Sequence, residues 1–161
     1  LVLHETDGAP AHGTHFDGYW RAMRVLAAAE RLGGAEALGR LYTAMGTRIH
    51  PGGAGFDGID DALIAASIDD AGLPADLMEA ADDASLEAAI RASHAESQDA
   101  VGTQIGTPIV RVGGRAFFGP VVNPAPRGED AARLFDAVAT MSTIPAFAEL
   151  KRGRDPEIRL T

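Results

Sequence analysis

The segment GTPIVRVGGRAFFG (residues 106–119) contains two apolar stretches separated by a glycine pair, and it decides the expected fold. The two stretches predict short strands, and Gly113-Gly114 can supply the positive φ angles that a two-residue hairpin turn needs. Pro108 has no backbone N–H, so it is tolerated at the first residue of a strand but not in its middle. We therefore predict a hairpin that opens at Pro108 and turns at the glycine pair.

The bond between Thr107 and Pro108 is the second expectation from this segment. An X-Pro bond has only a small preference for trans, and a cis bond in a folded protein usually marks a specified tight turn. We predict a cis bond here, and the alternative is an ordinary trans proline that starts an edge strand. This placement leaves the Thr107 backbone free to pair with an external group.

Composition narrows the classes of function. The 161 residues, 46% of them hydrophobic, can bury a sizeable core as one domain. The net charge of −9 argues against nucleic-acid binding, which needs a concentrated basic surface. No apolar run approaches the roughly eighteen residues of a membrane span, so we expect a cytoplasmic protein. The chain contains no cysteine, which excludes disulfides and thiolate metal sites within it.

Before the hairpin the chain predicts helices. Apolar residues at three-to-four spacing indicate five helical stretches, and a sixth follows the hairpin. Their expected ranges are about 17–32, 35–49, 57–71, 74–81, 85–101 and 129–141. We expect Ser85 to cap the fifth helix, Phe135 to point inward on the sixth, and the glycine-rich loop 51–55 to form no regular structure. A two-stranded hairpin is marginal by itself in water, and Leu1-Val2-Leu3 alone looks like the end of a further strand. We therefore expect an incomplete central sheet, with the missing strands upstream of Leu1.

Five blocks, in order, carry a family resemblance. They are residues 41–50, residues 99–102 leading to 106–108, residues 116–121, residues 126–129 and residues 147–152. With these blocks the chain resembles the actinobacterial mycothiol-dependent nitroreductases, which are relatives of the FrnE-like disulfide oxidoreductases. The resemblance covers most of the chain from about Trp20 onward.

The resemblance implies an α/β, thioredoxin-like (DsbA-like) fold with an inserted helical domain. The first strand and the first helix, with its cysteine pair, would be missing from this chain. Residues 1–16 would end a strand and form a connecting loop, and residues 17–104 would be the inserted helical domain. Residues 105–145 would be the C-terminal half of the thioredoxin fold, with the cis-proline hairpin and a helix, and residues 146–161 a tail.

The resemblance also implies an activity. In this family a Cys-Pro-Trp-Cys motif begins the first helix, whose N-terminus lowers the pKa of a cysteine. The thiolate exchanges with the co-substrate mycothiol, and the system reduces a disulfide or a nitro-aromatic compound. Because this chain has no cysteine, it holds no catalytic residue of that kind, and we expect the 161 residues alone to be inactive.

Six residues are expected to line the thiol and substrate site: Thr107, Pro108, His50, Gly106, Trp20 and His4. The Thr107–Pro108 turn would face the cysteine pair. His50 ends a predicted helix, where the dipole favours a protonated imidazole, and simple capping is the alternative. Trp20 can offer an aromatic wall, although its helical spacing favours a core position. His4 follows the presumed strand end and would edge the pocket.

Other readings of the residues stay open. His12 and His15 can approach each other, but zinc needs a third or fourth ligand, so we expect no metal. Kappa-class glutathione transferases and 2-hydroxychromene-2-carboxylate isomerases share the inserted helices and the cis-proline, but use a serine in place of the first cysteine. A redox-inactive binding module is the non-catalytic alternative. The residue at the missing strand-to-helix junction distinguishes the two classes of enzyme.

Overall fold

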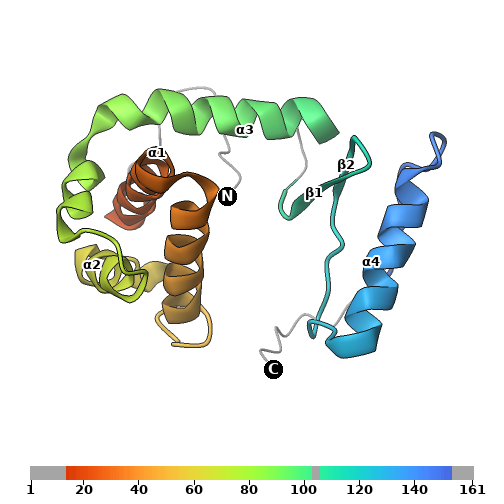
Figure 1. Ribbon diagram of the computed structural model, residues 1–161, viewed down its shortest axis with the longest axis horizontal. Helices are drawn as coiled ribbons and strands as arrows, with labels where there is room; N and C mark the ends of the chain where they lie inside the picture. The colour runs from red at the N-terminus through yellow and green to blue at the C-terminus, as the bar shows by residue number, and fades with distance from the viewer. Residues whose placement is uncertain (1–13, 103–105, 154–161) are drawn as a thin grey trace. The chain divides into compact units, whose positions relative to one another are not determined.

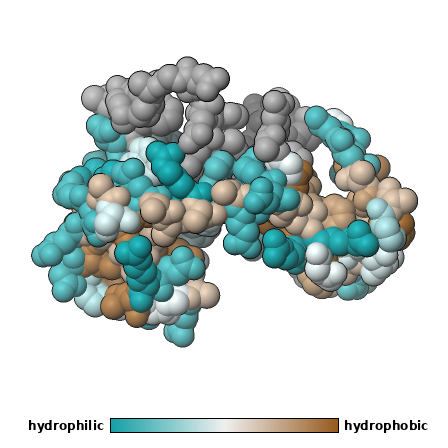
Figure 2. All heavy atoms as spheres, turned by 90° about the horizontal axis from the view of Figure 1, so that it is seen from above, coloured by the Kyte–Doolittle hydropathy of each residue, from teal (hydrophilic) through white to brown (hydrophobic). Residues whose placement is uncertain are grey.

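The computed structural model describes residues 14–102 and 106–153, with side chains from residue 17 onward. The described chain is mainly helical, with one small two-stranded sheet, and this content is compatible with the expected α/β class (Figure 1). It falls into two compact units that divide between residues 93 and 94. On the face shown in Figure 2, the described residues form a mixture of polar surface and separate apolar patches.

The first unit begins with α1 (Thr14–Ile49), which is bent at two glycines. Gly33 and Gly34 leave the helical conformation, and Gly34 has φ of 64°, which a residue with a side chain rarely adopts. The two helices that the sequence predicts, about 17–32 and 35–49, are therefore confirmed as two segments that meet at this bend.

Shorter elements follow α1. They are η1 (Phe56–Gly58), α2 (Asp61–Asp70), η2 (Ala75–Asp82), η3 (Ala84–Leu86) and α3 (Glu87–Val101). The predicted start of a helix at residue 57 is wrong, because Asp60 caps α2 by accepting a hydrogen bond of 2.8 Å from the Leu63 N–H. The stretch at 74–81 forms a 3₁₀ helix, which is tighter than the predicted α-helix.

The core of this unit lies between the two segments of α1, α2 and η2. Its buried members are Ala22, Val25, Ala29, Leu41, Met45, Ile64, Ile68, Ala71, Leu77 and Ala81. Small alanines on α1 let the neighbouring helices approach closely, while the larger Leu41, Ile64 and Val25 are fully buried.

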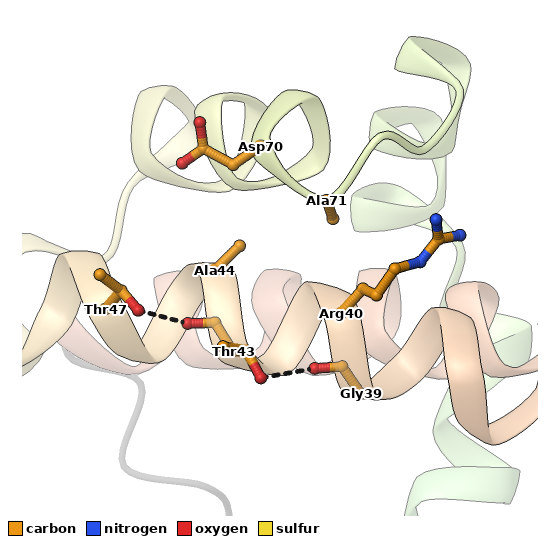
Figure 3. A pocket seen from close by; sticks show the side chains of 7 residues that line it. All are labelled: Gly39, Arg40, Thr43, Ala44, Thr47, Asp70 and Ala71. Atoms are coloured by element: carbon orange, nitrogen blue, oxygen red, sulfur yellow. Dashed lines mark hydrogen bonds between the residues drawn. The ribbon is translucent and has the colours of Figure 1, made fainter.

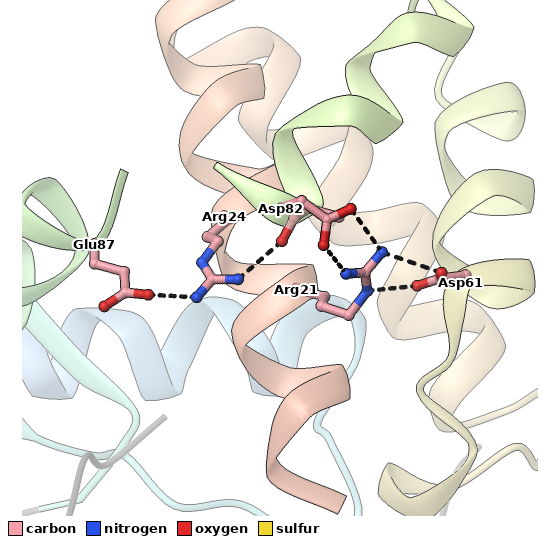
Figure 4. A network of polar contacts seen from close by, with 6 residues as sticks. Arg21, Arg24, Asp61, Asp82 and Glu87 are labelled. Carbon is pink, nitrogen blue, oxygen red and sulfur yellow. Dashed lines mark hydrogen bonds and ion pairs between the residues drawn. The ribbon is translucent and has the colours of Figure 1, made fainter. Parts of the chain in front are cut away.

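Two arginine side chains on the surface of this unit link elements that are far apart in the sequence (Figure 4). Arg21 of α1 pairs with Asp61 at 2.7 Å and also with Asp82, so it joins α2 to η2. Arg24 donates to the Ala81 carbonyl at 2.9 Å and pairs with Glu87 at the start of α3. Each exposed pair contributes little alone, but this network links four elements.

The second unit contains the hairpin. Strands β1 (Ile109–Val112) and β2 (Arg115–Phe118) pair antiparallel, with Ile109 opposite Phe118. Gly113 and Gly114 form the turn with φ of 58° and 80°. The predicted two-residue hairpin and its register-setting glycines are confirmed.

Helix α4 (Gly128–Ser142) contacts β1 and matches the predicted range within one residue at each end. Its buried side chains are Val138 and Ser142. Phe135 was expected to point inward, but it is 62% exposed. The reason is helical geometry, because a face centred on Val138 and Ser142 includes Leu134 and leaves Phe135 on its flank.

Truncation of a core side chain tests the packing of the first unit. We expect Leu41→Ala to lower the free energy of unfolding by about 2–5 kcal/mol, because it leaves a cavity among buried helices. Leu32→Ala is the matched control, since Leu32 lies on the same helix and is 55% exposed. Urea denaturation measures both variants, and equal effects at the two positions would contradict this description of the core.

A pH-dependent cap gives a second test. Asp83, rather than the predicted Ser85, caps η3 by accepting from the Ser85 N–H at 2.9 Å. Hydrogen bonds from the Ser85 side chain and backbone lower the pKa of Asp83. The ionised Asp83 carboxylate therefore stabilises the folded state fully above the unfolded-state pKa of about 4. This stabilisation is lost as pH falls through the lower folded-state pKa.

We accordingly expect Asp83→Ala to lower the thermal midpoint at pH 6 and to have a smaller effect at pH 2. Asp76→Ala is the control, because Asp76 is an exposed carboxylate in the first turn of η2. A destabilisation by Asp83→Ala that is independent of pH would be inconsistent with capping by the ionised carboxylate.

The cis-proline turn and the candidate thiol site

The turn before β1 has the geometry that the sequence predicts. The Thr107–Pro108 peptide bond is cis, and Pro108 immediately precedes the first strand residue. The Pro108 carbonyl accepts a hydrogen bond of 2.8 Å from the Gly119 N–H, which fixes the turn to the end of β2. Thr107 and Pro108 are exposed, and Gly106 is half-buried.

This turn presents backbone groups to solvent. Within residues 14–102 and 106–153, no backbone–backbone hydrogen bond involves Thr107, and the residue is exposed. Backbone groups without an internal partner can pair with an extended ligand. Neither Thr107 nor Pro108 carries a thiol, so the turn supplies no thiolate nucleophile of its own.

Two further cis bonds follow the hairpin, at Gly119–Pro120 and Asn123–Pro124. The sequence analysis did not predict them. The Gly-Pro and Asn-Pro dipeptides are turn signals, but a dipeptide alone does not specify the isomer, because X-Pro bonds are mostly trans.

His50 lies at the end of α1 and takes part in a continuous cap. The last carbonyls of the helix accept hydrogen bonds from the following loop, and the donor–acceptor pairs are His50–Gly46, Gly52–Thr47, Gly53–His50, Ala54–Arg48 and Gly55–Ile49, at 2.8–3.3 Å. As the sequence predicts, the glycine-rich stretch at 51–55 forms neither helix nor strand, and its backbone N–H groups cap the end of α1. The backbone of His50 belongs to this cap, and its exposed imidazole contacts Phe56, with ring centres 5.3 Å apart.

Trp20 lies half-buried on α1, outside the core cluster. The prediction from helical spacing that Trp20 lies in the core is therefore wrong. The Arg91 guanidinium lies 5.4 Å from the centre of the indole ring, at cation–π distance. Trp20 and His50 belong to the first unit, whereas Gly106, Thr107 and Pro108 belong to the second. His4 lies outside the described residues.

Aromatic side chains meet at a place that periodicity did not indicate. Tyr19 stacks on Phe56 with ring centres 6.1 Å apart and an interplanar angle of 28°. Burial raises the pKa of Tyr19, and the negative charge of Asp57 adds to the rise. Phe56 begins η1 and is far from Tyr19 in the sequence, so no local spacing could reveal the pair.

A shallow groove of about 490 Å³ runs between α1 and α2 (Figure 3). Its lining residues are Gly39, Arg40, Thr43, Ala44, Thr47, Asp70 and Ala71. Thr43 and Thr47 donate their hydroxyl protons to helix carbonyls at 2.8 Å, and Asp70 accepts from Arg48. Its polar groups are mostly engaged within the protein, so the groove offers little specific chemistry.

Two classes of site are not found among the described residues. No group of three or more metal-ligating side chains comes together there. None of the helices in the same ranges is long and apolar enough to cross a membrane. His12 and the side chain of His15 lie outside what the structure describes.

Comparison with known proteins identifies the family to which the chain belongs. A sequence model of the Rv2466c-like family, described as mycothiol-dependent nitroreductase Rv2466c, matches residues 2–152. The chain belongs to this family. The family membership that the resemblance implies is therefore confirmed.

A curated relative is the "Uncharacterized protein Rv2286c" of Mycobacterium tuberculosis (strain ATCC 25618 / H37Rv). It is 32% identical over 138 residues, which cover 85% of this chain and 58% of the relative. The chain thus spans less than two thirds of the length of the relative that it matches.

Substitution of Gly52 tests the helix cap that includes the His50 backbone. A Cβ on Gly52 would lie 2.6 Å from the Arg48 carbonyl oxygen, so we expect Gly52→Ala to destabilise the protein by about 1–3 kcal/mol. Gly39→Ala is the matched control on α1, where a Cβ meets nothing within 4 Å, and it should stabilise the helix by about 0.5–1 kcal/mol. Thermal unfolding compares the two, and a neutral Gly52→Ala would contradict the cap.

Proposed function

We propose that this chain is part of a mycothiol-dependent oxidoreductase with a thioredoxin-like (DsbA-like) fold. The catalytic Cys-x-x-Cys would lie on a strand-to-helix junction that precedes Leu1. The observation that carries this proposal is the exposed cis Thr107–Pro108 turn at the start of β1, in a chain that matches the nitroreductase family over residues 2–152.

The small size of the sheet supports the proposal that it has additional strands. A two-stranded hairpin is only marginally stable in water without further strands or a covering layer. Among the described residues the hairpin pairs with no third strand, and α4 contacts β1. Phe118, Val121 and Val122 remain 42–48% exposed at and after the end of β2. Apolar surface of this kind fits a sheet that continues with further polypeptide.

The proposed chemistry is thiol-driven reduction. Two thiols are oxidised to one disulfide and release two electrons and two protons. These reduce a disulfide to two thiols, or a nitro group to a nitroso group with loss of water. A cysteine at a helix N-terminus supplies the thiolate, because the dipole lowers its pKa.

The residues of this chain would bind and orient the reactants. The exposed Thr107 backbone would pair with the peptide-like part of a bound thiol, and Pro108 would fix the turn that presents it. The full set of proposed thiol- and substrate-binding residues is Thr107, Pro108, Gly106, His50, Trp20 and His4. The predicted domain boundaries, with an inserted helical domain at 17–104 and a thioredoxin half at 105–145, belong to the same proposal.

Activity of two forms tests this function. The form that includes the residues encoded upstream of Leu1 should reduce a nitro-aromatic probe with mycothiol, and the 161-residue chain should not. Substitution of the first upstream cysteine by serine is the control and should abolish turnover. Turnover by the 161-residue chain would refute the role of the missing cysteines, and a natural serine at that junction would favour a transferase or isomerase.

A further inference from the structure

We draw no further inference here: the strongest candidate, the outer face of the second segment of α1, on which the 68% exposed Tyr42 lies between Gly39 and Gly46, carries nothing because the described part of the chain does not show what covers it.

Discussion

The bend in α1 at Gly33 and Gly34 is the constraint on which the helical unit depends. A straight helix of this length would extend over about 54 Å at 1.5 Å per residue and would present its apolar side chains along one long stripe. Gly34 adopts a positive φ, so the two segments leave the bend in different directions. Both segments then contribute to one core with α2, and Val25 and Leu41 become fully buried.

The sequence predicted features that depend on local chemistry. The hairpin follows from a glycine pair between two apolar runs, and the cis bond follows from Thr107-Pro108 at a strand start. The prediction of Phe135 as buried failed, because a helix has one buried face and the choice of its centre depends on the partner. The start of α2 was missed because the capping side chain of Asp60 determines it.

The candidate site was predictable only in part for the same physical reason. The turn at Thr107 and Pro108 was predictable, because any proline restricts the backbone of the residue before it. The contact of Phe56 with Tyr19 joins residues far apart in the chain, and nothing in either local pattern indicates it. The ion pairs of Arg21 with Asp61 and Asp82 were equally unpredictable, because they join residues far apart in the sequence. They show that this acidic chain uses an arginine to hold two of its elements together.

The cap at the end of α1 restricts the length of the loop that follows it. Its backbone donors are His50 and residues 52–55, and its acceptors are the carbonyls of residues 46–50, so each pairing depends on the number of residues between donor and acceptor. Composition is restricted as well, because Gly53 and Gly55 adopt φ of 76° and 65°. Insertion or deletion of one residue between Pro51 and Gly52 would shift the four pairs that span this point. Homologous proteins that keep this cap should therefore keep the same spacing here.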